Sequence, residues 1–151
     1  MNNLIAAIDP GKTGAIALLY SDLSLYIEDM PVFGKEVSGT GLAATFKEFT
    51  PTHIYIESVN SFGMGRQSAF NFGQGLGVIK GVLGTLQIPY SLVTPSKWKQ
   101  HFNLGRDKDA ARAAATRLFP NNANQFEKKK DDGRAEAALL ALWAYEKGEK
   151  R

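Results

Sequence analysis

Residues 4–11 read LIAAIDPG, and this stretch decides how the chain begins to fold. The apolar residues 4–8 predict a buried strand, and a second apolar run at residues 14–20 predicts its antiparallel partner across a Pro-Gly turn. Asp9 therefore ends a buried strand, where a carboxylate is costly unless its charge is compensated. A divalent cation compensates it directly, because Mg²⁺ and Mn²⁺ prefer oxygen ligands. The alternative is that Asp9 only begins the turn, where aspartate is common.

The rest of the chain follows an α/β pattern. Further strands are expected at residues 25–32, 53–57 and 88–93. Helices are expected at residues 40–49, 67–86, 95–102, 107–118 and 132–147. Antiparallel strands come first and βαβ units follow, which predicts a five-stranded mixed sheet with helices on both faces. The polar segment 121–130 is expected to be a loop too short to divide the chain, so residues 1–151 are expected to form a single domain.

The composition indicates an ordinary globular protein. Its 151 residues are 44% hydrophobic and 22% charged, which allows one domain with a real core. The absence of cysteine excludes disulfides and thiolate metal sites and agrees with a reducing cytoplasm. The sequence has no apolar run of about 18 residues and no signal-peptide pattern at its start, so we expect neither a membrane span nor secretion.

Charge is distributed unevenly along the chain, whose formal net charge is +3. Residues 1–75 carry 4 lysines and arginines against 7 aspartates and glutamates, whereas residues 76–151 carry 14 against 8. A basic half that faces an acidic site suits a polyanion held by its phosphates. A solvated, lysine-rich surface is the alternative.

Glu57 is the second carboxylate that the fold can bring to Asp9. It ends the apolar strand 53–57, which the sheet order can place beside the first strand. Both carboxylates would then emerge at the same edge of the sheet. The alternative is that Glu57 is merely exposed at the end of a strand.

The last helix supplies further carboxylates. Asp132 and Glu136 are four residues apart and therefore share one helix face. Asp131 or Asp132 can also act as the N-cap of this helix, but a cap does not explain Glu136. Carboxylates from separate segments match a two-metal site for phosphodiester hydrolysis, in which no histidine base is needed.

Basic residues follow the strand at 88–93. Lys97 and Lys99 come directly after it, Lys108 lies in the turn before the alanine-rich helix, and Arg112 lies one turn later. Lysines near a cleaved phosphate stabilise the charge that develops there. Each of these residues can otherwise be an ordinary solvated side chain.

The loop at residues 60–66 directly follows Glu57 and contains Phe62 and Arg66. Aromatic and basic side chains on a loop beside a metal site can stack on bases or wedge open a branch. Phe70 and Phe72, in the helix that follows, are expected to belong to the core.

A glycine stripe, defined here as Gly73, Gly77 and Gly81, lies on one face of the helix at 67–86. Each glycine costs roughly 1 kcal/mol relative to alanine in a helix interior. The glycine stripe allows another backbone to come close. That backbone is either the sheet on which the helix packs or the same helix in a second copy of the chain.

These motifs, in this order and over nearly the whole chain, resemble the RuvC-type Holliday junction resolvases, which have a ribonuclease H-like fold. The matching segments are residues 8–14 and 56–59 for the first two acidic motifs, 72–77 for the dimer helix, 93–99 with Lys108 for the active-site lysines, and 132–141 for the final acidic helix.

The resemblance implies a homodimeric endodeoxyribonuclease that nicks opposed strands of a four-way DNA junction. It implies two Mg²⁺ ions per active site, for which Mn²⁺ substitutes, and a role in recombination, repair or phage DNA processing in the cytoplasm of a bacterium or a phage-infected host cell. The implied catalytic residues are Asp9, Glu57, Asp132, Glu136, Lys99 and Lys108, of which the four acids would bind metal, with Asp131 as a possible further ligand. The residues expected to contact DNA are Lys12, Phe62, Arg66, Lys97, Lys99, Arg106, Lys108 and Arg112, and the dimer contact is expected at Gly73, Gly77 and Gly81.

The last acidic pair departs from the pattern of the cellular family members, whose final two acids are usually three residues apart. Gly133 stands three residues before Glu136, so the partner must be Asp132, and the final acid is Glu rather than Asp. This resembles phage-type relatives, which are often less selective for four-way junctions. The alternatives are a flap or RNA nuclease of the same fold and a non-catalytic junction-binding module. Residues 9–14 also resemble the phosphate loop of actin-like sugar kinases, which need two such domains.

Overall fold

The two apolar runs that flank the Asp9 turn form the centre of a five-stranded mixed sheet. The structure is a computed structural model in which residues 3–148 are described. The sheet has the order β3-β2-β1-β6-β7. Its strands are β1 (Ile5–Asp9), β2 (Ala15–Leu19), β3 (Leu25–Asp29), β6 (His53–Glu57) and β7 (Tyr90–Val93). β1 runs antiparallel to β2 and parallel to β6, and this confirms the predicted mixed sheet.

The register of the sheet sets where the acidic residues emerge. Ile8 of β1 pairs with Ile56 of β6, so the next residue on each strand, Asp9 or Glu57, lies at the same edge. β6 and β7 are also parallel, and Glu57 pairs with Val93. The carboxyl ends of β1, β6 and β7 therefore share one edge, and the segments that follow them meet there.

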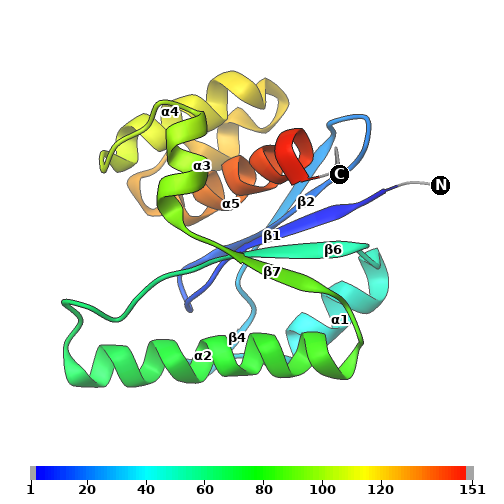
Figure 1. Cartoon of the computed structure of the whole chain (residues 1–151), viewed down its shortest axis with the longest axis vertical. Helices are drawn as coiled ribbons and strands as arrows, with labels where there is room; N and C mark the ends of the chain where they lie inside the picture. The colour runs from blue at the N-terminus through cyan, green and yellow to red at the C-terminus, as the bar shows by residue number, and fades with distance from the viewer. Residues whose placement is uncertain (1–2, 149–151) are drawn as a thin grey trace.

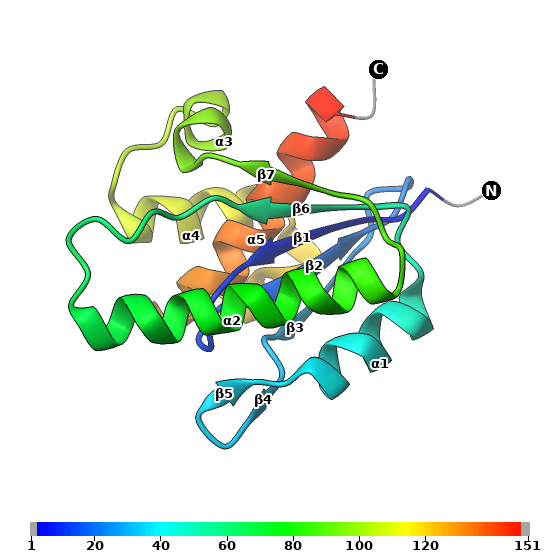
Figure 2. The same cartoon turned by 60° about the horizontal axis from the view of Figure 1, so that its bottom comes forward.

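Helices cover both faces of this sheet, as predicted (Figures 1 and 2). One face carries α1 (Gly39–Phe49) and α2 (Arg66–Thr85). The other carries α3 (Pro95–His101), α4 (Lys108–Leu118) and α5 (Asp132–Trp143), which continues as a π-helical turn at Ala144–Gly148. Within residues 3–148, no helix is both long and apolar enough to cross a membrane.

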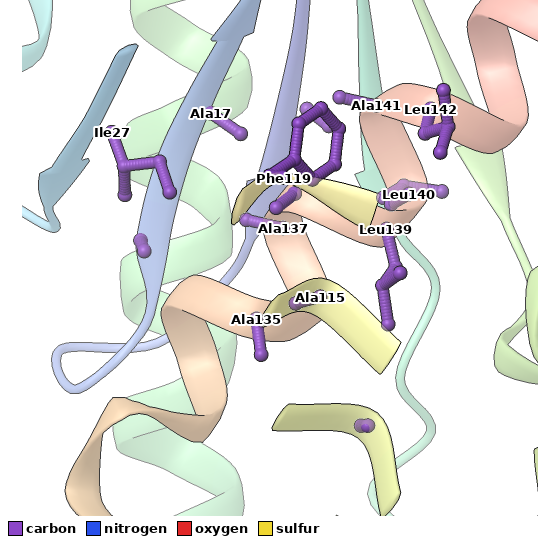
Figure 3. Close-up of a cluster of buried hydrophobic side chains, with 14 of the residues drawn as sticks. Ala17, Ile27, Ala115, Phe119, Ala135, Ala137, Leu139, Leu140, Ala141 and Leu142 are labelled. Carbon is purple, nitrogen blue, oxygen red and sulfur yellow. The ribbon is translucent and has the colours of Figure 1, made fainter. Parts of the chain in front are cut away.

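The sheet has a hydrophobic core on each face, and the side chains of β1 and β2 contribute to both. Because side chains alternate between faces, Ile8 and Ile16 point toward α1 and α2, whereas Ala7 and Ala17 point toward α5. Small residues on both β1–β2 and α5 let this helix lie close to the sheet, and Figure 3 shows the resulting cluster of alanines and leucines. The N-terminus of α5 is thereby brought to the Asp9 edge.

Two segments differ from the sequence prediction. The strand expected at 25–32 ends at Asp29, and the chain instead forms a small hairpin of β4 (Val32–Phe33) and β5 (Glu36–Val37), which turns at Gly34 with φ +64°. The loop expected at 121–130 forms two 3₁₀ helices, η1 (Pro120–Phe126) and η2 (Lys129–Asp131), because Phe126 is buried against α4 and α5 and anchors the polar segment.

Candidate metal-dependent active site

Three of the predicted carboxylates meet at the shared edge of the sheet. Asp9, Glu57 and Glu136 each offer one oxygen, and these three oxygens lie within 4.8 Å of one another. Asp9 ends β1, Glu57 ends β6, and Glu136 lies in the second turn of α5. We call these three residues the carboxylate cluster. Its oxygen-only donor set fits a hard divalent cation such as Mg²⁺ or Mn²⁺.

Two glycines allow the close approach that forms the carboxylate cluster. A Cβ at Gly133 would lie 2.9 Å from the carbonyl oxygen of Thr13 and 3.1 Å from Oδ2 of Asp9. A Cβ at Gly14 would lie only 1.8 Å from the carbonyl oxygen of Asp9. Gly14 therefore lets the β1–β2 turn close tightly on the backbone of Asp9, and Gly133 lets the start of α5 rest directly on that turn.

The carboxylates are electrostatically strained by this proximity. Burial raises the pKa of Asp9 well above its usual range, and the negative charges of Glu136 and Glu57 raise it further. Burial and the charge of Glu136 likewise raise the pKa of Glu57. A bound cation would reverse this effect, because opposite charge favours the ionised form of a carboxyl.

Lys108 supplies positive charge at the carboxylate cluster. Its Nζ lies 3.1 Å from Oδ2 of Asp132 and 3.2 Å from Oε1 of Glu136. Partial burial alone would lower the pKa of Lys108, but the charges and hydrogen bonds of Glu136 and Asp132 outweigh it and raise the pKa. Lys108 therefore remains protonated next to the site.

The fourth predicted acid, Asp132, lies beside the carboxylate cluster and not among its three members. It is joined to Glu136 through Lys108, and its side chain is 30% exposed, whereas that of Glu136 is 7% exposed. Asp131 has a different function. Its Oδ2 accepts a hydrogen bond of 2.9 Å from the backbone N–H of Lys128, and its Oδ1 lies 3.5 Å from Arg134. Asp131 thus closes the turn before α5.

Trp98 is a site residue that the sequence analysis missed. It is fully buried, and its Nε1 donates a hydrogen bond of 2.8 Å to Oε2 of Glu57. Lys99 lies next to it, with its Nζ 5.5 Å from the centre of the indole ring. The signal in the sequence was a large apolar residue between two lysines directly after a buried strand, which marks the inward face of the short helix α3.

Comparisons with known proteins agree with this geometry at the level of the fold. Neither a protein-family model nor a curated protein sequence matches the chain. The structure of Thermus thermophilus RuvC in complex with a Holliday junction substrate matches with a TM-score of 0.69 and 15% identity, over 97% of this chain and 95% of that one. The chain has a RuvC-like ribonuclease H fold.

Two further solved structures support the RuvC-like fold. Another structure of Thermus thermophilus RuvC gives a TM-score of 0.66 at 15% identity, with 96% of both chains covered. The yeast mitochondrial Holliday junction resolvase Ydc2 gives 0.55 at 14% identity, over 92% of this chain and 76% of that one. The fold is thus that of known Holliday junction resolvases, and the carboxylate cluster is consistent with an active site.

Most residues expected to contact DNA are exposed on segments that follow the carboxyl ends of the strands in this RuvC-like fold. Phe62, on the loop after β6, has 94% of its surface exposed. The exposed cationic residues of the predicted set are Lys12, Arg66, Lys97, Arg106 and Lys108.

Arg112 has a structural function instead. Its guanidinium donates hydrogen bonds to the carbonyl oxygens of Phe126 and Glu127 and to Asp109. These bonds tie η1 and the residue that follows it to α4. We therefore leave Arg112 out of the DNA-contact residues proposed below.

The outward face of α2 also differs from the sequence prediction. Phe70, expected in the core, is 68% exposed, and Phe72 is only partly buried. The glycine stripe is exposed, and a Cβ built at any of its three residues meets no atom within 4 Å. Packing against the sheet, one of the two interpretations of the glycine stripe, is therefore wrong. The buried glycine of this helix is Gly75, whose Cβ would lie 3.1 Å from Cγ2 of Val37.

Proposed function

We propose that this protein is a Mg²⁺-dependent endonuclease that cuts branched DNA and resolves four-way junctions. The observation that carries the proposal is the carboxylate cluster, in which three buried or partly buried acids from separate elements place oxygens within 4.8 Å of one another. The fold supports the proposal, since a RuvC bound to a Holliday junction substrate matches over 97% of the chain.

The carboxylate cluster would hold the first ion, and Asp132 would contribute to a second. Ions bound at these residues would activate the attacking water and stabilise the charge that develops on the leaving oxygen. Trp98 fixes one oxygen of Glu57 by its hydrogen bond, which leaves the other oxygen for the ion. With one oxygen bonded to Trp98 and the other free for the ion, the carboxylate of Glu57 is held in one orientation.

The cationic residues would act on the DNA backbone. Lys108 is protonated and would contact the cleaved phosphate, and Lys99, whose positive charge also acts on Glu57, would assist it. The exposed ring of Phe62 would stack on a base at the branch point, because aromatic faces bind unpaired bases without sequence preference.

We further propose that two copies of the chain associate through the glycine stripe. Three glycines in a helix cost stability, and among the described residues no atom lies within 4 Å of a Cβ built at any of them, so packing within one copy does not require their small size. A second helix lying on this face would do so, and a two-fold dimer presents two active sites to two opposed strands. We also propose that the protein resembles phage-type relatives in its selectivity for branched DNA, as the positions of Gly133 and Glu136 suggest.

A cleavage assay tests the proposal. Purified protein and Mg²⁺ are incubated with a labelled four-way junction, a flap and a plain duplex, and we expect the junction to be cut preferentially at paired positions. Asp9→Asn should abolish cleavage and retain junction binding. Glu48→Gln, an exposed acid on α1, is the matched control and should cut normally. Equal cutting of all three substrates would contradict junction specificity, and cleavage by Asp9→Asn would contradict the metal site.

A further inference from the structure

A groove of about 450 Å³ lies beside the candidate active site, on the α1–α2 side of the sheet. Its walls are the N-terminal half of α2, the β1–β2 turn that follows Asp9, and the β4–β5 hairpin. Figure 2 shows this hairpin projecting on the same side of the sheet as α2. The sequence prediction had no hairpin here and therefore no groove.

The walls of the groove are fixed by close contacts at its base. Val37 of the hairpin is buried and packs on Gly75 of α2, where a side chain would not fit without displacing it. At the other end, the position of a Cβ on Gly11 is 3.9 Å from the ring of Phe72. The hairpin is thus attached to α2 at Val37, while its tip carries Phe33 with 84% of its surface exposed.

The lining of the groove offers the groups that recognise a nucleotide. The amides of Gln67, Asn71 and Gln74 line it, and each amide can donate and accept hydrogen bonds, as base edges require. Gln67 donates to Asn71 over 3.0 Å, and Gln74 donates to Glu36 over 3.2 Å, so these side chains are held in the wall. Lys12 and Lys35 add positive charge, and Phe72 adds an aromatic surface.

We propose that this groove binds one unpaired nucleotide of the DNA strand that enters the carboxylate cluster. Gly11 and Lys12 line the groove and follow Asp9 by two and three residues on the same turn, so this end of the groove lies next to the carboxylate cluster. The base stacks on Phe72 and bonds the amides of α2, and the adjoining phosphates lie near Lys12 and Lys35. The inference rests on the proposed function, since it names where the strand goes next to the cleaved bond.

Nuclear magnetic resonance can test the groove directly, because side-chain amides give their own signals. The ¹⁵N-labelled protein is titrated with a 5′-phosphorylated thymidine hexanucleotide in EDTA. We expect saturable shifts of the Asn71 and Gln74 side-chain amides and none at Asn124, which is exposed on η1. Shifts restricted to residues outside the groove would overturn the proposal. Equal affinity for thymidine monophosphate would show a free-nucleotide site and would overturn it as well.

Variants then measure what the groove contributes. Phe72→Leu keeps an apolar side chain and removes the stacking surface, so we expect about tenfold weaker hexanucleotide binding. Asn71→Ala should weaken binding several-fold, and Asn124→Ala is the matched control that should leave it unchanged. Unchanged binding in both groove variants contradicts the proposal.

A second probe separates this inference from the proposed function. Junctions carrying 2-aminopurine at single positions on either side of the cleaved bond are bound to the Asp9→Asn protein in Ca²⁺. One position should change its fluorescence, and Asn71→Ala in the same background should reverse that change. Junction cleavage with no responsive position would refute the groove alone. Hexanucleotide binding at the groove without junction cleavage would refute the proposed function and leave the groove in place.

Discussion

The indole of Trp98 contacts Glu57 from within the core, and its effect on the site is local. A hydrogen bond from a buried donor orients a carboxylate and fixes which of its oxygens faces outward. Glu57 carries a raised pKa despite this bond, because burial and the charge of Glu136 outweigh it. Trp98 is therefore a positioning residue for Glu57.

We expect Trp98→Phe to lower metal affinity by about 10–100-fold, because outer partners of metal ligands contribute on this scale. Phenylalanine keeps most of the packing and removes the donor. Isothermal titration with Mn²⁺ measures the affinity, and Trp143→Phe, at a tryptophan packed edge-to-face on Tyr55, is the control. In Trp143→Phe the fluorescence of Trp98 should respond to Mn²⁺. Unchanged Mn²⁺ affinity in Trp98→Phe would refute its positioning role.

Helix α5 reaches the β1–β2 turn only because Gly133 has no side chain. We expect Gly133→Ala to lower the free energy of unfolding by about 1–3 kcal/mol, since the added Cβ meets the backbone of Thr13 and the carboxylate of Asp9. The helix must move away, so metal affinity should fall with stability. Urea unfolding and Mn²⁺ titration measure the two effects. Gly105→Ala, at a glycine with open space around it, is the control, and equal stability of both variants would contradict the contact.

Helix α2 exposes the glycine stripe, and a bulky substitution there tests the dimer. We expect wild-type protein to have twice the mass of one chain by light scattering and Gly77→Leu to have the mass of one. Ala113→Leu adds similar bulk on an exposed position of α4 and should leave the mass unchanged. If no dimer forms, Gly77→Leu should instead stabilise the monomer, because leucine is the better helix former. A monomeric wild-type protein would contradict the proposed association.

Most elements could be predicted because their apolar period is clear. The strand at 53–57 was placed at its true ends, and helices α1 to α5 were each found within a few residues. The β4–β5 hairpin was missed because its strands have two residues each and its contacts are made with α2, far along the chain. The 3₁₀ helices were missed because a single buried Phe126 anchors a polar segment.

The acids of the site could be predicted because strand ends and helix faces follow from periodicity. Asp9, Glu57 and Glu136 needed only the sheet order to be brought together. The partners of these acids could not be found in this way. The bond from Trp98 to Glu57 joins residues 41 positions apart, and the contact at Gly133 depends on how closely two elements approach.

Across the whole molecule, the raised pKa values make metal binding dependent on pH. Protons compete with the ion for Asp9 and Glu57, and their raised pKa values move this competition to a higher pH than for ordinary carboxylates. We therefore expect Mn²⁺ affinity to fall as the pH is lowered from 8 toward 5. Titration calorimetry at several pH values measures this, and an affinity independent of pH would contradict the raised values.

The free energy of unfolding of the metal-free protein should change with pH in the opposite sense to the Mn²⁺ affinity. The folded protein retains protons on Asp9 and Glu57 that the unfolded chain has lost, so stability falls as the pH rises above about 4 toward the raised pKa values. Asp29, whose pKa is lowered by its hydrogen bond to Arg134, acts in reverse and loses its contribution only in more acidic solution. Urea unfolding of wild type and Asp9→Asn in EDTA should show a smaller pH dependence in the variant.

The position of Lys108 bears on the order in which the protein folds and binds its metal ions in a cell. Its ammonium group already balances part of the negative charge of Asp132 and Glu136 within the folded chain. The polypeptide can thus complete its folding on internal counter-charge, before any ion arrives. Ion supply would then set how much of the folded protein is competent for cleavage.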